Sequence, residues 1–146
     1  MAAGSVSGVL AARGGDVGVL WVDAHADINA PGTSPSGNLH GTPVSFLLRE
    51  LAMATGAADP GSTSSAPALL PPGWEWLAGV PALLPARLAY IGLRDLDPGE
   101  KAAVRALGLR AFTMADVDRL GIGAVVEQAL DHITGEGRGA VVEQAP

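Results

Sequence analysis

The sequence predicts an α/β fold built on a parallel sheet, and three observations support this. Two short apolar runs, 17–22 and 88–93, are each bounded by polar and glycine residues, which is typical of strands buried on both faces. Helical signals lie between and after these runs. Carboxylates come within two residues after both runs, and open parallel α/β sheets bind ligands beyond the carboxyl ends of their strands.

The composition of the chain excludes several classes of function. With 146 residues it has the size of one domain, and its net charge of −6 offers no basic cluster for nucleic acid or an anionic membrane. No apolar stretch is long enough to span a bilayer, and no secretory signal is evident. The absence of cysteine fits a reducing compartment, so we expect a cytoplasmic location, with mitochondria as the alternative.

The first strand and the polar residues after it form the most informative stretch. A weakly helical segment, 2–13, and a glycine turn lead into the strand at 17–22, and Asp23, His25 and Asp27 come next. If the strand continued through them, these three side chains would share one face. Two carboxylates and an imidazole suit a divalent metal from manganese to zinc. The alternative is a polar strand end with two solvated aspartates and a surface histidine.

A polar loop and a helix come next. The loop carries Asn29, Ser36, Asn38 and His40, and hydrogen-bonding groups on a loop beside a rigid strand are typical of an active site. Thr42 suits the N-cap and Pro43 the first turn of a helix that runs to about Thr55. We interpret 57–73 as a flexible surface insertion. Trp74 and Trp76 then either anchor a loop, which is favoured, or form an exposed binding patch.

The second strand, 88–93, is followed by Asp95 and Asp97, which are either another metal pair or a solvated turn. A helix from Pro98 to about Leu107, a strand at 109–113 and helices at 114–120 and 122–133 complete the predicted order. The heptapeptide at 123–129 recurs unchanged at 139–145. We therefore assign 1–136 to a partial domain and 137–146 to an atypical tail.

Three blocks in order resemble one known family. They are DAHADIN followed by SGNLHGTPVSFLLREL (23–29 and 36–51), YIGLRDLDPGE (90–100) and FTMADVDRLGIG (112–123). The chain resembles the arginase family of manganese ureohydrolases from about Ala3 to about Thr134. The resemblance implies a three-layer αβα fold with a parallel sheet, of the arginase/deacetylase-like type, of which this chain holds part.

The resemblance also implies an activity, the hydrolysis of L-arginine to L-ornithine and urea at two Mn²⁺ ions. The SGNLHG run favours arginase over agmatinase-like relatives, whose substrate has no amino-acid carboxylate. Asp27 would also hold the hydroxide, and Ser34 stands where the family more often has threonine. The implied roles are metal ligands Asp23, His25 and Asp27, proton shuttle His40, α-carboxylate contacts Asn29, Ser34 and Ser36 with Asn38 beside them, and α-amino contact Asp97 with Glu100 nearby.

Only three of the six family metal ligands have counterparts in this sequence. The others belong to segments like GGDHS and SFDVD, which the chain does not contain. We therefore expect weak Mn²⁺ binding, poor or no arginine hydrolysis and an exposed edge at the first strand. Family members form trimers, so a homo-oligomer is the expected assembly. The alternatives are a non-catalytic chain that associates with full-length subunits, and a generic carboxylate-rich metal-binding α/β module.

Overall fold

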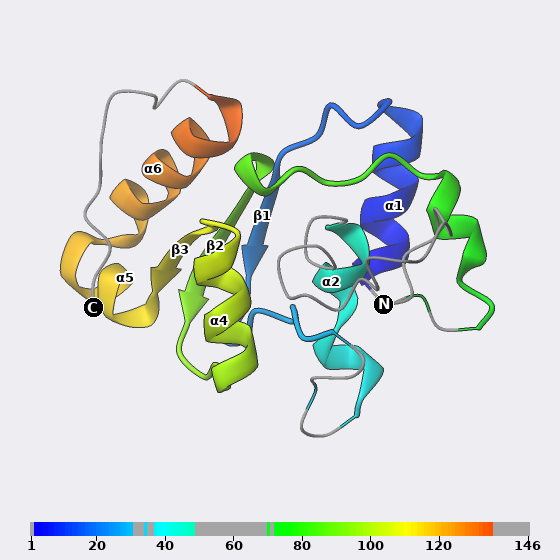
Figure 1. The fold of residues 1–146 in the computed structure, drawn as a ribbon. Coiled ribbons are helices and arrows are strands. Elements are labelled where there is room, and N and C mark those ends of the chain that lie inside the picture. Colours follow the sequence, from blue (N-terminus) through cyan, green and yellow to red (C-terminus); the bar gives the residue numbers. More distant parts are fainter. Residues whose placement is uncertain (1, 31–33, 35–36, 49–69, 71, 136–146) are drawn as a thin grey trace.

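A three-stranded parallel sheet forms the centre of the computed structural model, which describes residues 2–30, 34, 37–48, 70 and 72–135 (Figure 1). The strands are β1 (Val19–Val22), β2 (Leu88–Leu93) and β3 (Arg110–Thr113), in the order β1-β2-β3. Both pairings are parallel. The predicted α/β class with a parallel sheet is therefore confirmed.

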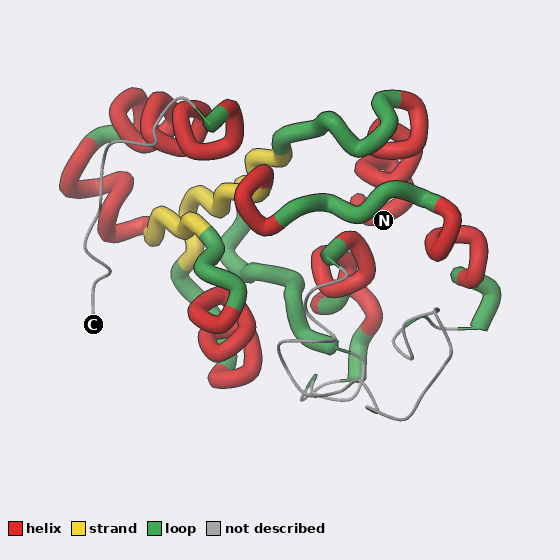
Figure 2. Tube along the Cα trace, turned by 45° about the horizontal axis from the view of Figure 1, so that its top comes forward, coloured by secondary structure: helices red, strands yellow, loops and turns green. Residues whose placement is uncertain are grey.

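Helices cover both faces of this sheet (Figure 2). The described α-helices are α1 (Ala2–Ala12), α2 (Pro43–Leu47), α4 (Pro98–Ala106), α5 (Met114–Leu120) and α6 (Ile122–Thr134). Short 3₁₀ turns are η1 (Leu39–Gly41), η2 (Glu75–Gly79) and η3 (Pro85–Arg87). None of the helices in the described ranges is long and apolar enough to cross a membrane.

The side chains of β2 alternate between two apolar clusters. Ala89 and Ile91 belong to the cluster formed with α6, whereas Leu88 and Tyr90 belong to a larger cluster on the opposite face. That second cluster includes residues of α1, α2 and α4: Leu10, Val44, Leu47 and Ala103. A register shift at Gly92, whose φ is +88°, then turns Leu93 into the larger cluster as well. All six residues of β2 are buried, and this strand is the central one of the described sheet.

The first strand differs from its prediction. It spans only Val19–Val22 rather than 17–22, and it lies at an edge of the sheet that the structure describes. Val22 is 71% exposed, so the expectation of a strand buried on both faces is wrong for β1 and right for β2. The reason is the number of neighbours, because β2 pairs on both sides and β1 pairs with β2 alone among the described strands.

The helix predicted from Pro43 to about Thr55 ends earlier than predicted within the described residues. α2 ends at Leu47, and Leu48 is extended, while residues 49–55 lie outside the described residues. Thr42 precedes the helix but does not cap it, because its hydroxyl donates to the Leu39 carbonyl oxygen at 2.8 Å instead. Most of the insertion predicted at 57–73, and the tail at 137–146, likewise lie outside the described residues.

The two tryptophans behave differently. Trp74 packs on the buried ring of Phe46, with 5.1 Å between ring centroids, as expected of a loop anchor. Trp76 stacks on Trp74 at 6.4 Å and is exposed. The anchor prediction therefore holds for Trp74 and not for Trp76.

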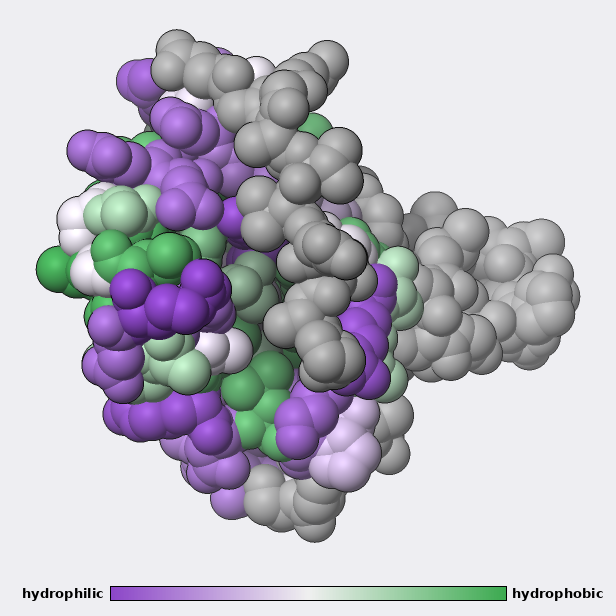
Figure 3. Space-filling model, turned by 90° about the vertical axis from the view of Figure 1, so that its left-hand side faces the viewer, coloured by the Kyte–Doolittle hydropathy of each residue, from purple (hydrophilic) through white to green (hydrophobic). Residues whose placement is uncertain are grey.

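The side of the molecule formed by α5 and α6 carries small apolar patches among polar surface (Figure 3). The exposed large apolar side chains of these two helices are Met114, Leu120, Ile122 and Leu130. The opposite, buried stripe of α6 is what holds it on β2, through Val125, Ala129 and Ile133.

Candidate active site

The chain bends sharply where β1 ends. The Asp23 amide still donates to the Ile91 carbonyl oxygen at 3.2 Å, but the Ala24 carbonyl oxygen accepts from both Arg94 N at 2.9 Å and Asp95 N at 3.1 Å. These two hydrogen bonds hold the turn at Ala24 against the end of β2, and β1 does not extend beyond Val22. The strand therefore does not continue through Asp23, His25 and Asp27, so the condition under which they would share one face is not met.

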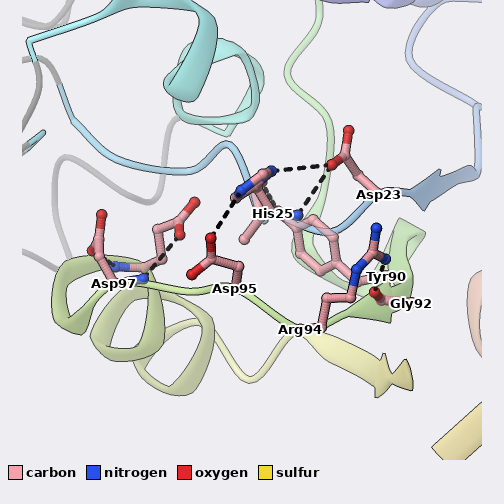
Figure 4. A network of polar contacts seen from close by, with 9 residues as sticks. Asp23, His25, Tyr90, Gly92, Arg94, Asp95 and Asp97 are labelled. Carbon is pink, nitrogen blue, oxygen red and sulfur yellow. Dashed lines mark hydrogen bonds and ion pairs between the residues drawn. The ribbon is translucent and has the colours of Figure 1, made fainter. Parts of the chain in front are cut away.

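His25 lies between two carboxylates (Figure 4). Its Nδ1 is 3.4 Å from Asp23 Oδ1, and its Nε2 is 3.4 Å from Asp95 Oδ2. The His25 backbone amide also donates to Asp23 Oδ1 at 3.1 Å. Asp95 was considered only as one of a possible metal pair with Asp97, and the family resemblance gave it no role. Its position two residues after the second strand, at the edge where parallel strands end together, indicates a contact with the residues that follow β1.

Asp27 is held in an unfavourable state. Its φ is +51°, a left-handed conformation that no other described residue except glycine adopts. Partial burial raises the pKa of Asp27, and the charges of Asp23 and Glu100 raise it further, while those of His25 and His40 lower it. Negative charge is therefore concentrated around this carboxylate.

These side chains do not fit a metal ion as they lie. Among the residues that the structure describes, no three histidine, cysteine, aspartate or glutamate side chains gather into a group that could hold one. Asp23, His25 and Asp27 have the donor atoms that manganese accepts, but both imidazole nitrogens of His25 face carboxylates. The residue types of the predicted ligand set therefore suit manganese, but their side chains are not arranged around one position that could hold the ion.

The substrate residues predicted on two distant segments do come together. Asn29, which is 5% exposed, donates from Nδ2 to Asp97 Oδ2 at 2.5 Å, so the loop after β1 contacts the start of α4. Burial on its own raises the pKa of Asp97. Hydrogen bonds from Glu100 N, from the Asn29 side chain and from Gly99 N, with the charge of Lys101, outweigh this and hold the pKa below 3.8. Asp97 is therefore an ionised carboxylate at neutral pH.

Asp97 and Glu100 also cap α4. Glu100 N donates to Asp97 Oδ1 at 2.9 Å, and Asp97 N donates to Glu100 Oε2 at 3.2 Å (Figure 4). This reciprocal capping box fixes the Asp97 carboxylate on the first turn of the helix. Glu100 is only 4% exposed, and its described contacts are those of the cap.

The Tyr90 side chain hydrogen-bonds to the loop that follows β1, and the sequence did not identify Tyr90 as a site residue. Its hydroxyl donates to the Ala26 carbonyl oxygen at 2.9 Å. Burial raises the pKa of Tyr90 well above its usual value, and the charges of Glu100 and Asp27 add to this, so it acts as a neutral hydrogen-bond donor. Its place as an inward residue of a buried strand was predictable, but its hydroxyl partner was not.

The remaining predicted residues lie on the loop before α2. His40 and Asn38 are exposed, on and just before η1. Ser34 is partly buried, and its amide donates to the Ala30 carbonyl oxygen at 3.1 Å. Ser36 lies outside the described residues. The structure thus brings Asn29 to Asp97 and His25 to Asp95, and leaves His40 and Asn38 at the surface.

Known proteins resemble this chain throughout most of its length. A model of the arginase family matches residues 1–142. Arginase-1 of Homo sapiens is 46% identical over 135 residues, which are 92% of this chain and 37% of the relative. Arginase of Eremothecium gossypii is 49% identical over 142 residues, which are 97% and 31% of the two chains. The chain therefore spans about a third of the length of the curated relatives that it matches.

Solved structures give the same result. The crystal structure of a cold-adapted arginase from the psychrophilic yeast Glaciozyma antarctica matches with a TM-score of 0.69 and 41% identity, over 92% of this chain and 42% of the other. Entamoeba histolytica arginase in complex with L-ornithine matches with a TM-score of 0.69 and 29% identity, over 92% and 40%. The sheet, the order of its segments and the sequence all agree with these proteins, and the chain belongs to the arginase family.

Proposed function

We propose that this chain serves the hydrolysis of L-arginine to L-ornithine and urea by holding the amino-acid end of the substrate. The observation that carries the proposal is the contact between Asn29 and Asp97, which joins two segments 68 residues apart at the carboxyl edge of the sheet. The family match supports the reaction.

The chemistry of the pair suits an α-amino acid. Asp97 is ionised and fixed by the helix cap, so it offers a charged acceptor to an ammonium group without further ordering. Asn29 has amide atoms that hydrogen-bond either charge of an amino acid. In the proposed pose the α-amino group meets Asp97, with Glu100 behind it. The α-carboxylate lies toward Asn29, with Ser34, Ser36 and Asn38 on its side.

The binuclear manganese site is proposed only for a protein that supplies further ligands. In such a protein Asp23, His25 and Asp27 would be three of the metal ligands, and His40 would be the proton shuttle. His25 must first leave Asp95 to take part. The chain by itself is expected to bind Mn²⁺ weakly and to release little or no urea. Its proposed assembly, by analogy with the family, is a homo-oligomer.

A second candidate function is favoured by one observation. Among the described residues, no three histidine, cysteine, aspartate or glutamate side chains gather into a group that could hold a metal. A chain of this kind can act without catalysis, by associating with full-length arginase subunits. This candidate predicts an effect on another protein's activity, which the first does not.

The test combines ligand binding with activity. L-Arginine is titrated into the chain while the amide signals of Asn29 and Asp97 are followed by NMR, with agmatine, which lacks the carboxylate, as the matched ligand. We expect L-arginine to shift both signals more strongly than agmatine, and Asp97→Asn to remove the shift. Equal responses to the two ligands, or none, would refute the amino-acid site.

Urea release then separates the two candidates. Mn²⁺ is titrated into the chain alone and into the chain mixed with human arginase-1, and urea is measured. We expect almost no urea from the chain alone. Turnover close to that of the human enzyme would contradict this expectation, and a changed rate in the mixture would favour the associating role.

A further inference from the structure

Gly99 is the second residue of α4 and lies against the Asn29–Asp97 pair. A Cβ built on Gly99 would be 2.8 Å from Asn29 Oδ1 and 3.2 Å from Asp97 Oδ1. Contacts under 3.0 Å are closer than real Cβ atoms make, so no side chain fits here unless one of these oxygens moves. Gly123 is the equivalent second residue of α6, and nothing lies within 4 Å of a Cβ built on it.

The Asn29 amide has one possible orientation at this place. An ionised carboxylate only accepts hydrogen bonds, so the amide nitrogen must face Asp97 and the amide oxygen must face away from it. That oxygen points at Gly99, is buried, and has no hydrogen-bond partner among the described residues. It is placed at the first turn of α4, where the helix dipole favours negative partial charge.

We infer that Gly99 is a positioning residue for substrate recognition. Because Gly99 has no side chain, the Asn29 amide oxygen can lie against the first turn of α4 while the amide nitrogen donates to Asp97. This role rests on the proposed function, in which the pair receives the amino-acid end of the substrate. A side chain on Gly99 would meet Asn29 and Asp97, so Gly99 acts on the ligand through these two residues.

The two glycines give opposite expectations. Alanine is more favourable than glycine in a helix, so Gly123→Ala should raise the melting temperature slightly. Gly99→Ala should lower it, because the added carbon meets the Asn29 oxygen. In an Asn29→Ala background most of that loss should disappear, since the nearer contact is gone. An equal loss in both backgrounds would overturn the inference.

NMR gives the readout that a merely structural glycine would not change. The side-chain amide signals of Asn29 are compared in the wild type, Gly99→Ala and Gly123→Ala, with Asp97→Asn as the reference for a lost charged acceptor. We expect Gly99→Ala to move these signals toward the Asp97→Asn position and Gly123→Ala to leave them in place. Unmoved signals in a folded Gly99→Ala would overturn the inference.

Binding of L-ornithine tests the link to recognition. We expect Gly99→Ala to weaken it about tenfold or more, the loss that goes with one hydrogen bond to a charged group, and Gly123→Ala to leave it unchanged. A moved Asn29 amide with unchanged affinity would overturn the assignment of Gly99 as a positioning residue. If the wild type binds no L-ornithine, the proposed function fails, while the amide comparison still decides how Gly99 acts on Asn29.

Discussion

The two halves of the candidate site differ in how well they are organised without a ligand. At the start of α4, Asp97 and Glu100 satisfy each other's backbone groups, and Asn29 is held on Asp97. At the end of β1, Asp27 has a left-handed backbone and carries a carboxylate whose pKa is raised. The first half is preorganised for an amino acid, and the second half is under electrostatic and backbone strain.

The difference arises from where each half finds its partners. A capping box joins residues three positions apart, so any chain that contains both residues can complete it. The negative charges around Asp27 come from Asp23 on its own loop and from Glu100 on α4, and their effect on its pKa outweighs the opposite effect of His25 and His40. A clustered set of carboxylates is stable only when it is protonated or meets a positive charge.

The largest effect is expected where the two halves are joined. Tyr90→Phe removes the hydrogen bond from the Tyr90 hydroxyl of β2 to the Ala26 carbonyl oxygen, which lies in the loop between Asp23 and Asn29. Because that group is buried, we expect the free energy of unfolding to fall by about 1–3 kcal/mol, measured by urea denaturation. Thr134→Val removes an exposed hydroxyl–carbonyl bond and is the control. Equal losses in the two variants would show that Tyr90 does not support the loop.

A smaller effect is expected at the organised half. Asp97→Ala removes the N-cap of α4 and should cost about 1 kcal/mol of unfolding free energy, whereas Asp97→Asn keeps a capping side chain and should cost less. Thr113→Ala removes the matching cap of α5, whose box pairs Thr113 with Asp116, and should cost a similar amount. If Asp97→Ala and Asp97→Asn were equally stable, the cap would not be what orders this half.

These two halves also differ in how far the sequence predicts them. The apolar run of β2 and the Asp-Pro start of α4 are local signals, and both elements appear where they were expected. The burial of β1 was predicted wrongly, because an apolar run does not reveal how many strands lie beside it. The pairing of His25 with Asp95 depends on the bend at Ala24, which arises only after β1 and β2 meet.

Residue roles were less predictable than residue positions. The family resemblance assigned Asn29 and Asp97 to the two ends of one amino acid, which stays a prediction, and the structure places the two side chains in contact. It did not reveal that Asp27 adopts a positive φ, since aspartate tolerates this conformation without requiring it. Nor did a helix start signal at Thr42 and Pro43 reveal that the threonine hydroxyl turns back to Leu39.

The smallest expected effect is the contribution of single charges to the free energy of unfolding. At neutral pH this contribution has opposite signs in the two halves. A carboxylate with a raised pKa, such as Asp27, stabilises the fold at low pH, and this contribution is lost as pH rises through its folded-state pKa. Asp97 and Asp116 have lowered pKa values, so their contributions are present above pH 3.8 and are lost as pH falls through their folded-state pKa values.

Asp27→Asn should therefore raise the free energy of unfolding at neutral pH, by less than the cap at Asp97 contributes, and this gain should vanish in acid. Asp97→Asn should lower it at neutral pH, and that loss should also vanish in acid. Urea denaturation of both variants at neutral pH and below pH 3.8 measures the two signs. A loss on Asp27→Asn at neutral pH would mean that a positive charge already offsets Asp23 and Glu100. The half of the site at the end of β1 would then be as well organised as the half at α4.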